Sequence, residues 1–169
     1  DGAAGGDVAA GSSARGDVAV GGEAAAGSGA GGDVAARSGE TLRGMPRRLR
    51  TSSPGSMRRA LIGTGFPFRN LERLEYYLAE FRRVVEGTAG ARRGGAAALD
   101  LCYVAEGRFD GFWEQSLSPW DYAAGVILIE EAGGSVSRVE GGDITLDPGS
   151  VLAGCSAAFM EELRALLAG

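Results

Sequence analysis

The chain has 169 residues, a net charge of −5 and no histidine, and all 17 of its basic residues are arginine. The lack of histidine excludes a Ser-His-Asp triad, a Cys-His pair and a histidine metal site, and the lack of lysine excludes a P-loop lysine and a Schiff base. Hydrolysis by this chain would therefore rest on carboxylates, hydroxyls and a metal ion. The length gives room for one domain with a moderate core.

Residues 1–36 form the first compositional segment. They are rich in Gly, Ala, Ser and Asp and contain no Leu, Ile, Met or aromatic residue. Such a segment buries too little apolar surface to offset the entropy cost of ordering it. The sequence therefore predicts a flexible low-complexity segment over 1–36 and a folded domain over 37–169.

The start of that domain is basic. Residues 43–59 (Arg43 to Arg59) carry six arginines and no acidic residue. A run of this kind could contact RNA or an acidic protein, and the alternative is a solvated face of a hairpin. The hairpin face is the interpretation that we favour.

The elements predicted after residue 69 alternate between helix and strand. Asn70 is expected to cap a helix that is followed by Gly87 and buries an apolar stripe in the core, consisting of Leu71, Leu74, Leu78, Phe81 and Val85. The remaining elements are predicted as a helix over 97–105, a strand over 109–114, a helix from Asp121 to Ala132, strands over 135–139 and 151–153, and a helix over 157–167. This alternation is typical of an α/β fold.

Acidic residues around these elements have ordinary interpretations. Asp121 follows Pro119 and precedes an apolar run, so it is expected to cap the helix by accepting a hydrogen bond from an early backbone N–H. Glu114, at a strand end, could be an exposed edge residue. Asp100 could make a structural hydrogen bond on its helix, and Asp110 a turn.

Two runs change these interpretations. One runs from Arg92 to Glu114 and contains Gly-Gly-Ala-Ala-Ala-Leu-Asp, and the other is Pro119–Gly125, followed by Glu130–Gly134. Together they closely resemble the C-terminal half of the inositol monophosphatase family, nearest to its bacterial inositol-1-phosphatase branch. The resemblance extends from about residue 37 to the end of the chain, and residues 61–68 resemble the family's strand and turn.

The resemblance implies the C-terminal α/β half of a layered αβαβα sugar-phosphatase fold. It implies that Asp121 is a ligand of Mg²⁺, that Glu114 contacts inositol hydroxyls, and that the backbone of Gly95 and Ala96 lines the sugar site. The implied reaction is hydrolysis of inositol 1-phosphate or a related phosphate monoester by water activated by Mg²⁺. A complete protein would be a homodimer.

The chain also departs from the family pattern. The metal-binding motif Asp-Pro-x-Asp-Gly-Thr is missing unless Asp1-Gly2 is its remnant, which would make Asp1 a second metal ligand. Ala96 stands where the family has Ser or Thr, and the preceding helices with their metal-binding Glu are absent. Since Mg²⁺ needs several converging oxygens, we expect this chain alone to be inactive. The alternative is a non-catalytic fragment that binds protein or RNA.

No secretory signal and no apolar run of about 18 residues are evident, so the sequence favours a cytoplasmic protein without membrane contact.

Overall fold

The computed structural model describes residues 48–68 and 70–169. The predicted segment 1–36, its boundary with the domain, Asp1, and the arginines at 43 and 47 lie outside the described residues. Residues 48–169 make up one compact unit by their internal contacts.

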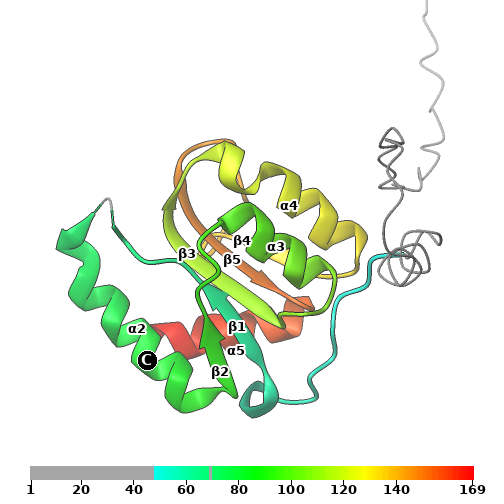
Figure 1. Cartoon of the computed structure of the whole chain (residues 1–169), viewed down its shortest axis with the longest axis horizontal. Helices are drawn as coiled ribbons and strands as arrows, with labels where there is room; N and C mark the ends of the chain where they lie inside the picture. The colour runs from blue at the N-terminus through cyan, green and yellow to red at the C-terminus, as the bar shows by residue number, and fades with distance from the viewer. Residues whose placement is uncertain (1–47, 69) are drawn as a thin grey trace, which may run out of the picture. The chain divides into compact units, whose positions relative to one another are not determined.

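A five-stranded sheet runs through this unit in the order β2-β1-β3-β5-β4 (Figure 1). β1 pairs in parallel with β2 and β3, whereas β5 pairs antiparallel with β3 and β4. The strands are β1 (Leu61–Thr64), β2 (Gly90–Arg92), β3 (Gly111–Leu117), β4 (Ser135–Ser137) and β5 (Gly149–Gly154).

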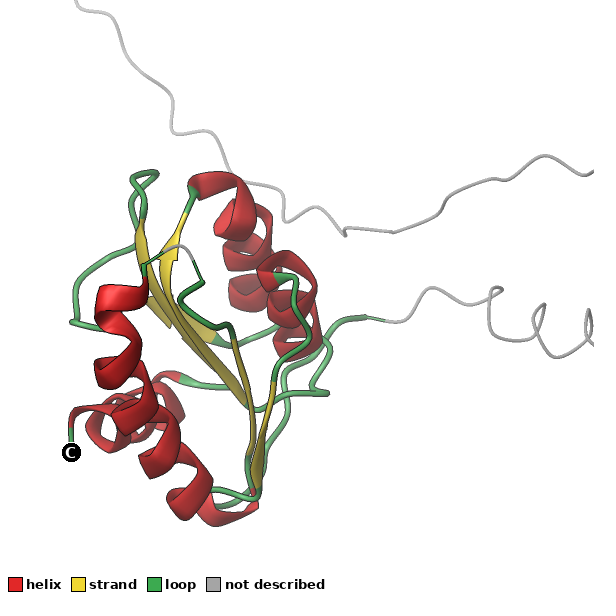
Figure 2. Cartoon of the chain, turned by 60° about the vertical axis from the view of Figure 1, so that its left-hand side comes forward, coloured by secondary structure: helices red, strands yellow, loops and turns green. Residues whose placement is uncertain are grey.

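Helices cover both faces of the sheet (Figure 2). They are α2 (Leu74–Gly87), α3 (Ala97–Ala105), α4 (Pro119–Glu131) and α5 (Ala157–Ala168), with short 3₁₀ helices η1 (Met57–Arg59) and η2 (Leu71–Arg73). Two apolar clusters fill the space between the layers. One joins Trp113 and Leu152 to Val84 of α2 and Leu163 of α5. The other joins Phe112 to α3 and α4. The predicted α/β class is confirmed.

Successive side chains of β3 point to opposite faces of the sheet, and this alternation decides which helices each side chain contacts. Trp113 points to the cluster of α2 and α5, and its neighbour Phe112 points to that of α3 and α4. Glu114 therefore shares the face of Phe112. The strand then bulges between Glu114 and Leu117, where Ser116 has a φ of +61°, a left-handed conformation that few residues other than glycine adopt.

The predicted core stripe of α2 is wrong. Leu71, Leu74, Leu78 and Val85 are exposed, and only Phe81 of the stripe is partly buried. The face turned to the sheet carries Tyr77, Glu80 and Val84 instead. A buried glutamate holds the helix in this rotation, because Trp113 Nε1 and Gln115 Nε2 donate to its carboxylate at 3.2 and 3.4 Å. Periodicity alone did not reveal that α2 buries a charged side chain.

Helix and strand ends also differ from the predictions. Asn70 stands before η2 rather than before α2, and its side chain makes no capping hydrogen bond. β3 begins two residues later than predicted. Before it, the carboxylate of Asp110 accepts hydrogen bonds from Leu61 N at 2.6 Å and from Ser52 Oγ at 2.5 Å. Asp110 thus ties the turn before β3 to β1 and to the segment entering the sheet. The short edge strand β2 was not predicted.

The basic segment is not a hairpin where it is described. Residues 48–56 form neither a helix nor a strand and bend at positions 55 and 56, and η1 follows. Arg48, Arg50, Arg58 and Arg59 are exposed, and Arg58 donates to the carbonyl oxygen of Glu86 at 3.1 Å. Within the described part of the chain, no helix is long and apolar enough to cross a membrane.

Candidate active site

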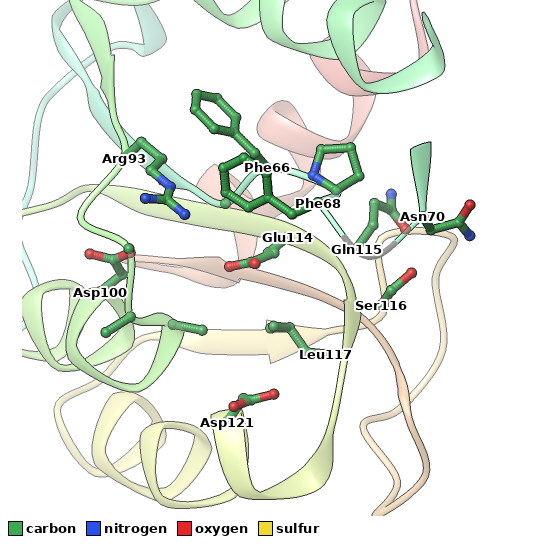
Figure 3. A pocket seen from close by; sticks show the side chains of 15 residues that line it. Phe66, Phe68, Asn70, Arg93, Asp100, Glu114, Gln115, Ser116, Leu117 and Asp121 are labelled. Carbon is green, nitrogen blue, oxygen red and sulfur yellow. The ribbon is translucent and has the colours of Figure 1, made fainter. Parts of the chain in front are cut away.

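A pocket of about 230 Å³ opens at one end of the sheet (Figure 3). Its walls come from the turn after β1, the segment before α3, the bulged end of β3 and the first turn of α4. Four of the residues predicted to form the site line this pocket, although they lie up to 26 positions apart: Gly95, Ala96, Glu114 and Asp121. Asp1, the fifth, lies outside the described residues.

Asp121 is held at the start of α4. The helix begins at Pro119, and Ser118 occupies the cap position. Asp121 Oδ2 accepts a hydrogen bond from Ser118 N at 2.9 Å, so the carboxylate reaches back across the first turn. The prediction that Asp121 itself is the cap is wrong. Proline favours the first helical position because its missing N–H and fixed φ cost nothing there. The helix therefore begins at Pro119, two residues before the predicted start at Asp121.

Glu114 projects from β3 into the same pocket. A side-chain carbon added to Gly65 would lie 2.0 Å from its carboxylate, so only glycine leaves room for this group. Burial, then the negative charges of Asp100 and Asp121, raise the pKa of Glu114 to about 7, and Arg93 acts in the opposite direction. Glu114 can therefore donate or accept a hydrogen bond near neutral pH. The alternative of an exposed edge residue is not supported, because the side chain is half-buried.

Asp100 is a pocket residue that the sequence interpretation assigned to structure. It is 1% exposed on α3, and its Oδ1 has no hydrogen-bond partner among the described residues. Gly94 makes room for this oxygen, since a side-chain carbon there would lie 2.3 Å from it. Burial raises the pKa of Asp100 to about 6, against the opposing charge of Arg93. One acid within an otherwise apolar helix, five positions after a pair of glycines, was the signal that could have identified it.

Arg93 supplies positive charge to this acidic pocket. Its guanidinium lies 5.3 Å from the ring centroid of Phe66 and 4.9 Å from that of Phe68, and the two rings pack edge to face. Both rings also line the pocket. The sequence interpretation did not single out these three residues, because the turn after β1 and the segment before α3 are brought together only by the fold.

The backbone at Gly95 and Ala96 continues the wall of the pocket that begins with Arg93. Gly95 has a φ of +92°, which glycine adopts without strain, and Ala96 occupies the cap position of α3. The first backbone N–H groups of a helix have no partner within it. Because Ala96 and Ala97 line the pocket, the first turn of α3 borders the space into which Glu114 projects.

The acidic side chains of the pocket are suitable ligands for a divalent cation, but too few of the described ones lie together to hold one. Carboxylate oxygens are the donors that Mg²⁺ prefers, and the mutual repulsion of Glu114, Asp100 and Asp121 is what a bound cation would relieve. However, the described residues contain no group of three or more side chains placed to hold a metal ion together. A complete metal site would need further oxygen ligands.

The sequence profile of the inositol monophosphatase family matches residues 24–168. The chain belongs to this family. It is 52% identical over 123 residues to a Nus factor SuhB of Pseudomonas aeruginosa, and 50% identical over 108 residues to an inositol-1-monophosphatase of Rhizobium meliloti. These matches cover 72% and 64% of this chain but only 45% and 41% of the relatives.

Solved structures of the family have the same fold. The extragenic suppressor protein suhB of Bartonella henselae matches with a TM-score of 0.67 and 42% identity, over 72% of this chain and 46% of that protein. The inositol monophosphatase of Anabaena matches with a TM-score of 0.66 and 39% identity, over 71% and 49%. The family resemblance and the predicted fold are confirmed. The chain spans about half the length of the relatives it matches.

Proposed function

We propose that the described residues form the substrate-facing part of a Mg²⁺-dependent phosphatase for inositol 1-phosphate or a related sugar phosphate. The observation that carries this proposal is the convergence of Asp121, Glu114, Gly95 and Ala96 on one pocket, in a chain of the inositol monophosphatase family. The presence of inositol-1-monophosphatases among the relatives agrees with it.

In this proposal each side of the pocket has its own task. Asp121 contributes one carboxylate to a Mg²⁺ site whose other ligands lie outside the described residues. When bound, the cation would neutralise phosphoryl charge and make water a stronger nucleophile. Glu114 accepts hydrogen bonds from ring hydroxyls, which hold the sugar in one orientation, and its raised pKa also lets it donate near pH 7.

The remaining residues complete the recognition of a charged, polyhydroxylated ester. Gly95 and Ala96 offer backbone groups in place of side chains, so that the sugar can approach closely. Arg93 brings a positive charge to the pocket, and it is held there by the faces of Phe66 and Phe68. The aromatic rings also keep water from one side of the arginine, which strengthens its attraction for a phosphate.

Binding of inositol 1-phosphate to the 169-residue protein tests the assignment of the sugar wall. We expect weak binding that shifts the NMR signals of the Gly95 and Ala96 amides and is lost in Glu114→Gln. The control Glu162→Gln changes an exposed glutamate on α5 and should leave binding unchanged. Shifts confined to residues outside the pocket would contradict the assignment.

A second candidate is a non-catalytic binding role. Several relatives carry the name Nus factor SuhB, and the exposed arginines at 48, 50, 58 and 59 could contact protein or RNA. Binding of RNA by the 169-residue protein, lost when Arg58 and Arg59 are changed to serine, would favour this role. Unchanged behaviour of that variant would remove the support that these arginines give.

A further inference from the structure

A second pocket adjoins the candidate active site. It has a volume of about 550 Å³, in the range of small-molecule sites, and its walls come from η2, the bulged end of β3 and the loop between β4 and β5. Gln115 and Ser116 line both pockets, so the two spaces meet at the bulge. Figure 3 shows these two side chains on the side of the first pocket across from Asp100. A ligand held in the first pocket can therefore extend past the bulge into the second.

The loop that forms the outer wall of the second pocket is held in place from within. Arg138 Nη1 donates to the carbonyl oxygen of Ser150 at 2.9 Å. Arg138 Nη2 donates to the carbonyl oxygens of Thr145 and Asp147 at 3.0 and 2.7 Å. The hydroxyl oxygen of Tyr122 lies 2.6 and 2.7 Å from the same two carbonyl oxygens. Because this wall is fixed before a ligand arrives, binding would cost little ordering entropy.

Gln115 brings an unpaired acceptor to the boundary between the two pockets. Its side chain is 8% exposed, Nε2 donates to Glu80 at 3.4 Å, and Oε1 has no partner among the described residues. The reverse orientation of the amide would set Oε1 against a carboxyl group that already accepts from Trp113. A buried acceptor without a donor is costly, and a hydroxyl group of a ligand would remove that cost.

The charges of the second pocket cancel, which favours a neutral ligand group. Arg73 and Arg138 contribute positive charge, and Glu140 and Asp147 contribute the same number of negative charges. Arg138 already uses its donors on the carbonyl groups of the loop. A second phosphate would therefore meet two carboxylates and little cationic charge that is free to bind it. Hydroxyl groups both donate and accept, so they suit this mixed set of side chains.

We infer that the second pocket binds a neutral sugar ring attached to the ring that carries the phosphate. The substrate class is then a phosphate monoester of a glycosylated sugar or glycosylated inositol. The second ring lies beyond Ser116, between Arg73 and Asp147, and one of its hydroxyl groups donates to Gln115 Oε1. The inference rests on the proposed function, because it extends the substrate of that same site.

NMR titration of the full 169-residue protein with matched probes tests the inference. Glucose 6-phosphate and trehalose 6-phosphate share the phosphorylated ring, and trehalose 6-phosphate adds one neutral glucose. We expect trehalose 6-phosphate to bind about tenfold more tightly, since the added ring gains a few hydrogen bonds. It should shift the amide signals of Gly149 and Ser150, which line only the second pocket. Glucose 6-phosphate should shift the signals of the first pocket without these two.

Two substitutions confined to the second pocket sharpen the test. Arg73→Gln and Asp147→Asn change exposed side chains that line the second pocket and not the first. Combined, they should bring the affinity for trehalose 6-phosphate to within about threefold of that for glucose 6-phosphate, and leave the affinity for glucose 6-phosphate unchanged. Asp143→Asn makes the same chemical change in the same loop at an exposed position outside both pockets. This control should keep the preference for trehalose 6-phosphate.

The outcomes separate this inference from the proposed function. Equal affinity for the two probes, with shifts at Gly95 and Ala96 but not at Gly149, would overturn the inference and leave the proposed function standing. Tighter binding of glucose 1,6-bisphosphate than of trehalose 6-phosphate, with shifts at Gly149, would overturn it in favour of a second phosphate. Shifts at Gly149 with neutral trehalose, when no sugar phosphate shifts Gly95, would keep the neutral sugar site and reject the proposed function. The absence of shifts with every probe would overturn both.

Discussion

Glu114→Gln tests whether the folded protein opposes ionisation of this carboxyl group. The substitution keeps the shape of the side chain and removes a charge that burial disfavours first and that the charges of Asp100 and Asp121 disfavour in addition. An acid whose pKa is raised by folding stabilises the protein fully only below its unfolded pKa, and this contribution is lost as the pH rises through the folded value. Glu114→Gln should therefore stabilise the protein at high pH and matter less at low pH.

The size of the effect follows from the two pKa values. For Glu114 they are the ordinary 4.5 and about 7 in the folded protein. Linkage then gives a loss of about 3 kcal/mol in the free energy of unfolding at about pH 8, against about 1 kcal/mol at about pH 5. The amide introduced by Glu114→Gln does not ionise, so the variant loses no stability through this group at either pH. Any intrinsic cost of the amide is the same at both pH values, so it cancels from the difference of about 2 kcal/mol.

Urea unfolding at these two pH values measures this difference. With EDTA present, the unfolding midpoint of Glu114→Gln minus that of the parent should be larger at about pH 8 than at about pH 5, by roughly 1 M. The control Glu162→Gln, on the exposed side of α5, should show no such dependence. If the midpoint difference for Glu114→Gln is the same at both pH values, folding does not raise the pKa of Glu114 and the account of this buried carboxyl group is wrong.

Two further substitutions test the frame around the pocket. Ser116→Gly should raise the free energy of unfolding by about 1 kcal/mol in the same assay, because glycine adopts the left-handed φ of +61° without strain, and a loss of stability would contradict this. Glu80→Leu should lower it by about 2 kcal/mol, since the N–H groups of Trp113 and Gln115 lose their buried acceptor. It should also change the fluorescence of Trp113. Unchanged stability and emission in Glu80→Leu would show that these hydrogen bonds do not hold the helix.

The sequence predicted well those elements whose local signals agree with their surroundings. The helix over 97–105 is apolar apart from Asp100 and packs against the sheet and α4, and it was predicted to the residue. The same reasoning failed for α2, because two hydrogen bonds from β3 make the buried position of Glu80 more favourable than its charge suggests. No sequence pattern reports a partner 33 residues away.

In the pocket, too, some residues could be identified from the sequence and others could not. Glu114 and Asp121 were identified because they stand in runs that resemble the family's motifs, and both line the pocket. Asp100 and Arg93 were not identified as site residues, since their importance depends on tertiary contacts: glycines that leave space for a carboxylate, and rings that receive a guanidinium. The role of Asp121 in binding a metal stays a prediction.

Phosphate release by a completed enzyme tests the central proposal most directly. Residues 48–169 would be fused to the part of the Pseudomonas aeruginosa relative that the match leaves uncovered, and inositol 1-phosphate would be supplied with and without Mg²⁺. We predict release that needs Mg²⁺ and falls at least about a hundredfold in Asp121→Asn, which keeps the fold but binds the cation poorly. Asp143→Asn, at an exposed loop position, should retain activity. Equal release by the Asp121→Asn fusion and its parent would contradict the proposal.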